Sequence, residues 1–209
     1  LLKEGKKPDS IYVTGNTAID ALKTTVRESY THPELEWAKD SRLIMITAHR
    51  RENLGEPMCH MFKAIRRVMD EHPDVKAIYP IHMNPAVRET ANEYLGNDDR
   101  IHIIEPLDVL DFHNFLSRSY LILTDSGGIQ EEAPSLGKPV LVMRDTTERP
   151  EGIAAGTLKL VGTEEETIYK EFSRLLSDKD EYEAMSKASN PYGDGHACER
   201  IADILEEKL

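Results

Sequence analysis

The chain contains the run Leu121-Ile122-Leu123-Thr124-Asp125-Ser126-Gly127-Gly128-Ile129-Gln130-Glu131-Glu132, in which an aliphatic strand pattern leads through Ser-Gly-Gly into a helix pattern. Short aliphatic runs of the same kind recur, with helical spacing of apolar residues between them. Strands and helices that alternate over short connections form right-handed βαβ units. We therefore expect an α/β fold, a Rossmann-like parallel sheet with helices on both faces. The expected strands are residues 11–13, 43–47, 76–79, 101–104, 120–123, 139–142 and 158–161.

Residues that begin and end helices agree with this pattern. Pro57 and Pro85 fall where the first turns of helices are expected. Proline is tolerated there because the N–H groups of a first turn have no partner within the helix. Gly96 and Gly137 fall where helices should end. After the last expected strand the chain is purely helical, at 164–176, at 179–188 and in a final helix that ends at 209.

Composition limits the classes to which the chain can belong. Of its 209 residues, 39% are hydrophobic and 31% charged, which is ordinary for a globular protein. The net charge of -12 disfavours nonspecific binding to nucleic acid, and no apolar run approaches the roughly 20 residues that a membrane span requires. Cys59 and Cys198 fit no metal-ligand spacing, so we expect no metal site and a reducing, cytoplasmic setting. The start at Leu1, with no Met and no signal-peptide pattern, suggests a fragment.

The turn formed by Ser126, Gly127 and Gly128 predicts an anion site. Ligands of parallel sheets bind at strand carboxyl ends, and two glycines let a ligand approach the backbone. Ser126 can donate its hydroxyl, and the start of the following helix offers free N–H groups and a partial positive charge. A diphosphate would fit such a site. From these residues alone, a tight turn that Ser126 or Asp125 merely caps is an equally good interpretation.

Glu131 and Glu132 strengthen the interpretation as a nucleotide site. One carboxylate in the first turns of this helix can accept hydrogen bonds from both hydroxyls of a ribose, and we favour Glu132 for this role. The alternative is that both acids only stabilise the helix dipole. That alternative explains their position but not the Ser-Gly-Gly turn before them.

Polar clusters follow two other expected strands. Residues 48–55 bring His49 and Arg50 to a strand end, where an arginine can bind phosphate oxygens in pairs and a histidine can exchange a proton near neutral pH. Residues 79–85 bring His82 to the end of the next strand. Because these strand ends meet at one edge of the sheet, we favour a binding site there.

Residues 144–150 form a further loop that is dense in charge. Like the other polar loops, it could simply be solvated and hold local ion pairs. A pair between Arg149 and Asp145 is the obvious candidate. Its place after a strand nevertheless favours the binding site.

Taken together, these segments closely resemble the bacterial non-hydrolysing UDP-N-acetylglucosamine 2-epimerases. The motifs are long and specific, and they cover nearly the whole chain. That family has the two-domain GT-B fold, in which two Rossmann-like halves face one cleft, and this chain matches only the carboxyl-terminal half. The matching segments are residues 13–17, 48–53, 79–85, 123–139, 144–151 and 190–195.

The resemblance implies a role for each candidate residue. His49 would be the catalytic residue that faces the sugar and the scissile bond. Arg50 and His82 match residues that some bacterial members use to bind a second, regulatory UDP-N-acetylglucosamine. The implied substrate contacts are Ser126, Gly127 and Gly128 to the diphosphate, Glu132 to the ribose, Arg149 to a further part of the substrate, and Leu107 and Phe112 to the uracil.

The resemblance also implies a reaction that needs no redox cofactor. UDP is eliminated to give 2-acetamidoglucal and is then re-added, which interconverts UDP-N-acetylglucosamine and UDP-N-acetylmannosamine. The catalytic carboxylates of the family lie in its amino-terminal half, so we expect this chain alone to be inactive. The implied partners are UDP-N-acetylglucosamine or UDP, the missing amino-terminal domain and, in the full-length protein, a second copy in a homodimer.

On this resemblance the chain divides into four parts. Residues 1–14 would end the missing domain, 15–40 would connect the two domains, and 41–190 would form the UDP-binding Rossmann-like domain. Residues 191–209 would form a helix that returns to the amino-terminal domain. An apolar stripe on that helix, Ile201, Ile204 and Leu205, would be exposed without that domain and would favour association.

Three other functions compete with this one. A GT-B glycosyltransferase shares the fold and the nucleotide site, although the sequences of residues 49–53 and 145–151 favour the epimerase. A non-catalytic module that only binds nucleotide sugars is a second alternative. A hydrolysing epimerase, the third, would release free N-acetylmannosamine and UDP.

Overall fold

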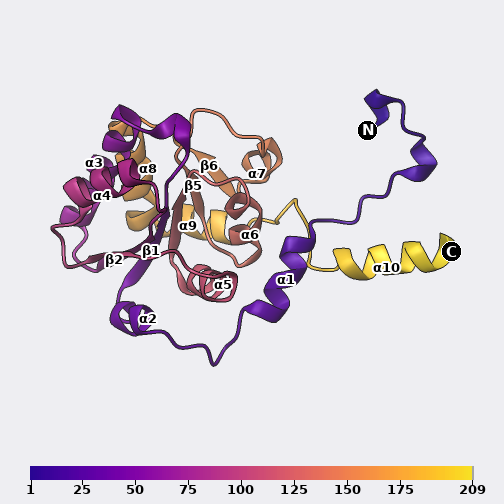
Figure 1. The fold of residues 1–209 in the computed structure, drawn as a ribbon, viewed down its shortest axis with the longest axis horizontal. Coiled ribbons are helices and arrows are strands. Elements are labelled where there is room, and N and C mark those ends of the chain that lie inside the picture. Colours follow the sequence, from indigo (N-terminus) through magenta and orange to yellow (C-terminus); the bar gives the residue numbers. More distant parts are fainter. Residues whose placement is uncertain (209) are drawn as a thin grey trace.

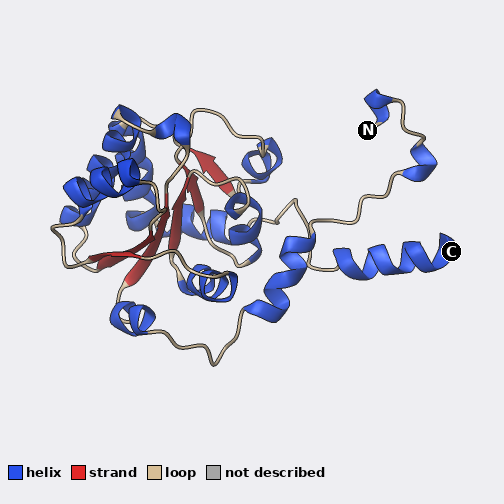
Figure 2. Cartoon of the chain, in the orientation of Figure 1, coloured by secondary structure: helices blue, strands red, loops and turns tan. Residues whose placement is uncertain are grey.

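In the computed structural model, which describes residues 1–208, one parallel sheet has the strand order β3-β2-β1-β4-β5-β6. Figure 2 shows this sheet at the centre of the body with helices around it. The order reverses between β1 and β4, and in open α/β sheets ligands bind at such a point. The strands are β1 (Arg42–Thr47), β2 (Val75–Pro80), β3 (Ile101–Ile104), β4 (Leu121–Thr124), β5 (Val140–Val142) and β6 (Leu158–Leu160).

Helices cover both faces of the sheet (Figure 1). Hydrophobic residues of α3, α4 and α8 share one core with the sheet, and residues of α2, α5 and α6 share the other. The α-helices are α1 (Thr17–Thr25), α2 (Pro33–Ala38), α3 (Glu56–Glu71), α4 (Pro85–Leu95), α5 (Val109–Arg118), α6 (Ile129–Ser135), α7 (Pro150–Ala155), α8 (Glu165–Ser177), α9 (Lys179–Ser186) and α10 (Ala197–Lys208); short 3-10 helices are η1 (Leu2–Glu4), η2 (Pro8–Ser10) and η3 (Arg51–Asn53).

Successive residues of the central strands point to opposite faces, and both faces are buried. Ile44 and Ile46 belong to the core beneath α3, α4 and α8, whereas Met45 belongs to the core beneath α2, α5 and α6. None of these three side chains is exposed to solvent. The central strands therefore need apolar residues at every position, which is why they stand out in the sequence as continuous aliphatic runs.

The expected α/β fold with a parallel sheet is confirmed, but the strand expected at residues 11–13 is wrong. These residues form no regular structure, and Val13 is 96% exposed. They lie in an arm that extends away from the sheet (Figure 1). A strand needs a neighbour to pair its backbone groups, and among residues 1–208 no strand pairs with residues 11–13.

The segment from 15 to 40, expected to connect two domains, contains α1 and α2. Helix α1 packs against α5, α6 and α10. Both ends of the chain leave the body near α1: the amino-terminal arm and α10 extend on the same side in Figure 1. Among residues 1–208, no helix has the length and hydropathy needed to cross a membrane.

Candidate functional site

A cavity of about 380 Å³ opens at the carboxyl ends of β1, β2 and β4. It gathers most of the side chains that the sequence singled out, from segments far apart in the chain. Within residues 1–208, no group of three or more His, Cys, Asp or Glu side chains could hold a metal ion. The lining consists of the predicted residues His49, His82, Leu107, Phe112, Ser126, Gly128 and Glu132, together with Thr47, Pro80, Ile81, Met83, Pro106 and Ile129.

The three remaining predicted residues, Gly127, Arg50 and Arg149, meet beside this cavity. A Cβ placed on Gly127 would lie 3.7 Å from Arg50 Nη2 and 3.9 Å from Arg149 Nη2. Two guanidinium groups therefore flank the bare backbone of the turn. An arrangement of this kind can bind the oxygens of a phosphate or diphosphate.

The alternative that Ser126 or Asp125 merely caps the helix is wrong. Helix α6 begins after Gly128 and receives no side-chain capping hydrogen bond. Instead, the N–H of Ser126 donates to Thr124 Oγ1 at 2.9 Å, and the carboxylate of Asp125 points back to the loop after β1. The hydroxyl of Ser126 therefore remains available at the cavity wall.

Arg149 does not pair with Asp145, the ion pair considered from the sequence. Its Nε pairs with Glu131 Oε1 on α6, while the other oxygen of Glu131 accepts a hydrogen bond from Asn16 Nδ2. Asp145 instead lies 3.5 Å from the hydroxyl of Thr163. Glu131 thus holds the guanidinium of Arg149 beside the turn and ties it to the start of α1.

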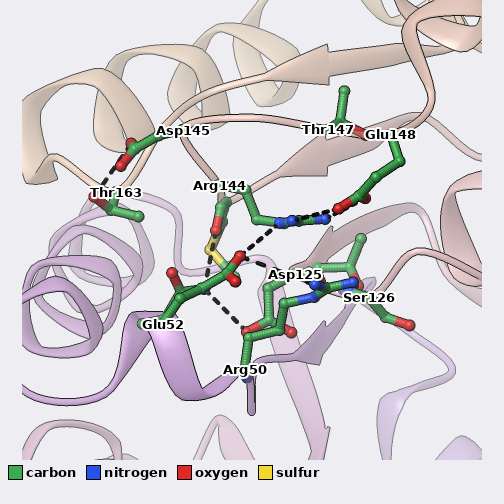
Figure 3. A network of polar contacts seen from close by, with 12 residues as sticks. Arg50, Glu52, Asp125, Ser126, Arg144, Asp145, Thr147, Glu148 and Thr163 are labelled. Carbon is green, nitrogen blue, oxygen red and sulfur yellow. Dashed lines mark hydrogen bonds and ion pairs between the residues drawn. The ribbon is translucent and has the colours of Figure 1, made fainter.

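Arg144 joins the loop after β1 to the loop after β5 (Figure 3). Its side chain is buried, and its Nη1 and Nη2 donate to the two oxygens of Glu148 at 2.8 and 2.9 Å. Its Nε donates to Glu52 Oε1 at 3.0 Å. Hydrogen bonding to Arg144 lowers the pKa of Glu148 to about 2. Arg144 was not predicted as a site residue, because nothing in a single sequence marks an arginine as buried.

Glu132, the predicted ribose ligand, lies against His113, which was also not predicted from the sequence. His113 Nε2 is 3.6 Å from Glu132 Oε2, and the ring is almost wholly buried. On its other side, Nδ1 lies 2.7 Å from Thr25 Oγ1 at the end of α1. The sequence feature that could have identified this histidine is its place among the apolar residues of α5.

His49 and His82 lie side by side at the ends of β1 and β2. Their rings stack with centroids 5.3 Å apart and an interplanar angle of 10°. The N–H of Asn84 donates to His82 Nδ1 at 3.1 Å, so the proton of a neutral His82 ring is on Nε2. His82 can therefore offer a donor to an oxygen-rich ligand.

This chain is similar to known proteins over almost its whole length. Residues 1–206 match the family model described as UDP-N-acetylglucosamine 2-epimerase. The Bacillus subtilis protein of that name is 66% identical over 205 residues, which is 98% of this chain and 54% of the relative. The chain thus spans about half the length of the curated relatives that it matches.

Solved structures agree with the sequence matches. The structure of S. aureus MnaA with UDP has a TM-score of 0.96 and 56% identity, covering 100% of this chain and 57% of that one. UDP-GlcNAc 2-epimerase from Neisseria meningitidis, solved with UDP-GlcNAc, has a TM-score of 0.89 and 43% identity, covering 99% and 58%. A more distant likeness, at 16% identity and a TM-score of 0.61, is to the carboxyl-terminal domain of a glycosyl transferase from Francisella tularensis. It bears on the fold alone and agrees with the carboxyl-terminal domain of a GT-B fold.

Proposed function

Because this chain belongs to the UDP-N-acetylglucosamine 2-epimerase family, we propose that it is the half of such an enzyme that binds UDP-N-acetylglucosamine. The observation that supports this most strongly is the meeting of two arginines beside the bare backbone of Gly127. The formal net charge of the chain is -12, so an anionic ligand needs such a local cluster of cations.

Each part of the nucleotide sugar has chemically suitable side chains or backbone in the cavity or beside it. The diphosphate would lie on Ser126, Gly127 and Gly128 with Arg149 beside it. Glu132 would accept hydrogen bonds from the ribose hydroxyls. The apolar side chains of Leu107 and Phe112 would enclose the uracil.

The sugar would then face His49. In the proposed reaction, UDP leaves by anti elimination across C1 and C2 and is re-added after protonation at C2 from the other face. This interconverts UDP-N-acetylglucosamine and UDP-N-acetylmannosamine without hydrolysis or a redox cofactor. Such chemistry needs cations that stabilise departing UDP, and acid and base groups on both faces of the sugar. We propose that turnover requires the part of the longer relatives that this chain does not cover.

Arg50 and His82 are proposed to bind a second, regulatory UDP-N-acetylglucosamine. Arg50 reaches the Ser-Gly-Gly turn and His82 lines the cavity, so the second molecule would adjoin the first. For the whole protein we propose a cytoplasmic homodimer that serves cell-wall polysaccharide biosynthesis. We further propose that residues 1–14 and 191–209 contact the other domain, that 15–40 connect the two, and that 41–190 form the nucleotide-binding domain.

Calorimetric titration of this chain with UDP tests the proposal. Glu132→Gln removes one charged partner of the ribose, and loss of such a hydrogen bond costs roughly 1.5 to 3 kcal/mol. We therefore expect affinity to fall by about 10- to 100-fold, since each 1.4 kcal/mol is about tenfold. Ser126→Ala should also weaken binding, but less, because its hydroxyl is neutral.

Glu165→Gln is the matched control, because Glu165 occupies the first turn of a different helix, α8, away from the cavity. It should leave UDP affinity unchanged. If folded wild-type chain shows no heat with UDP up to millimolar concentration, or if Glu132→Gln binds as tightly as wild type, the proposed nucleotide site is wrong.

A further inference from the structure

Asp125 is a fully buried carboxylate to which the proposed function gives no task. Its Oδ2 accepts hydrogen bonds from the backbone N–H groups of His49, at 2.9 Å, and Arg50, at 2.8 Å. The same oxygen accepts from Asn53 Nδ2 at 3.1 Å. One carboxylate oxygen therefore fixes the start of the loop that presents His49, and Figure 3 shows Asp125 beside Arg50.

The other oxygen, Asp125 Oδ1, has no hydrogen-bond partner among residues 1–208, although solvent does not reach it. A buried acceptor without a partner costs free energy, and in native proteins such groups are rare. His49 Nδ1 lies 3.9 Å from this oxygen. That separation is longer than a hydrogen bond, but the imidazole is 43% exposed and has room to rotate toward the carboxylate.

Three polar groups near Asp125 and His49 are engaged elsewhere. Arg50 Nε donates to the backbone oxygen of Asp125 at 2.8 Å and not to its carboxylate. The hydroxyl of Tyr79, whose pKa is raised by burial and by the nearby Asp125, donates to the backbone oxygen of Ala48. His82 uses its Nδ1 to accept from Asn84. His49 Nδ1 is thus the group placed to satisfy Asp125 Oδ1.

We propose that Asp125 is a positioning residue that selects the tautomer of His49. Asp125 Oδ1 accepts the Nδ1–H, which leaves His49 Nε2 unprotonated and free to accept a proton or a hydrogen bond. A buried carboxylate behind a histidine has this effect in hydrolase triads, where it orients the ring and stabilises its charged form. What His49 then does to the sugar rests on the proposed function, whereas its tautomer does not.

Nitrogen-15 NMR of histidine-labelled chain tests the proposal directly. In slightly alkaline buffer, where an ordinary histidine is neutral, the shifts of the two ring nitrogens report which one holds the proton. We expect His49 to be mainly Nδ1-protonated in wild type. In Asp125→Asn, the amide oxygen can still accept from the loop while its NH₂ faces His49, so the dominant tautomer should reverse to Nε2-protonated.

His82 is the internal control, because Asn84 fixes its proton on Nε2 and its signals should not change in Asp125→Asn. Asn53→Ala removes a partner of Oδ2 only, and His49 should keep its Nδ1 proton in that variant. A wild-type His49 that is mainly Nε2-protonated overturns the proposal, and this result needs no variant to fold. Equal tautomer shifts in Asn53→Ala and Asp125→Asn would also overturn it, by showing that Asp125 only anchors the loop. Failure of UDP binding, by contrast, bears on the proposed function and leaves the tautomer measurement intact.

Discussion

At the scale of a single residue, substitution of Gly127 should change ligand affinity without changing the stability of the fold. Its φ is not positive, and an alanine methyl would make ordinary contacts of 3.7 and 3.9 Å with the two guanidinium groups beside it. We expect Gly127→Ala to change the free energy of unfolding by less than about 0.5 kcal/mol. The methyl would occupy the space where a phosphate approaches the backbone, so UDP affinity should fall at least about tenfold in a calorimetric titration.

Gly152 provides the contrasting variant. A Cβ there would lie 2.8 Å from both Leu158 Cγ and the hydroxyl of Tyr192, so Gly152→Ala should destabilise the fold by about 1 to 3 kcal/mol. Urea unfolding measures this cost. Loss of stability in Gly127→Ala, with UDP affinity retained, would show that the turn is structural and not a ligand contact.

The ion pair between Arg144 and Glu148 predicts a defined pH dependence. Arg144 lowers the pKa of Glu148 from 4.5 to about 2. As the pH falls, the carboxylate of Glu148 therefore takes up a proton in the unfolded chain at a higher pH than in the folded chain. The stabilisation is complete above about pH 4.5 and is lost as the pH falls toward 2. Glu148→Gln lacks this contribution. In urea unfolding at stepped pH, the stability gap between wild type and variant should be largest near neutrality and should narrow in acid; a constant gap would contradict the prediction.

At the scale of elements, α1 is connected to α6 at both ends. At its start Asn16 contacts Glu131 directly, and at its end Thr25 reaches Glu132 through His113. Asn16, which caps α1 by accepting from Ala18 N at 2.9 Å, also donates to Glu131. Asn16→Ala should therefore lower the free energy of unfolding by about 1 kcal/mol through loss of the cap. Loss of the hydrogen bond to a charged group should lower it by roughly a further 1.5 to 3 kcal/mol. Asn84→Ala is the matched control, because Asn84 caps α4 in the same way and, among residues 1–208, its side chain has no carboxylate partner. If urea unfolding shows the same loss of unfolding free energy in Asn16→Ala and Asn84→Ala, the contact with Glu131 contributes nothing to stability.

How far the elements could be predicted depends on burial. The central strands were predictable because both faces are covered, which demands unbroken aliphatic runs. Helix α1 was not, since only Ile19 and Leu22 are buried in it and the apolar pattern is too sparse. Seven of the residues that line the cavity were predicted, either by their place at strand ends or by the family resemblance.

The contacts that hold the site in place were missed for a different reason. Arg144 and Glu52 are 92 positions apart, and His49 and Asp125 are 76 apart. Their pairing arises only when the loops after β1, β4 and β5 come together at one edge of the sheet. A single sequence shows which residue types are available, but it does not show which loops meet.

At the scale of the whole molecule, the amino-terminal arm and α10 present apolar side chains to solvent. Val13 is 96% exposed, and on α10 Leu205 is 54% and Ile201 36% exposed. Apolar surface of this kind tends to become covered by association. We expect the chain to self-associate as its concentration rises, and the double variant Ile201→Lys with Leu205→Lys to reduce this in sedimentation velocity. Ile153→Lys is the control, because Ile153 is similarly exposed, at 39%, but lies on α7 in the body. If all three proteins associate equally, or none does at high concentration, the apolar stripe of α10 is not an interaction surface.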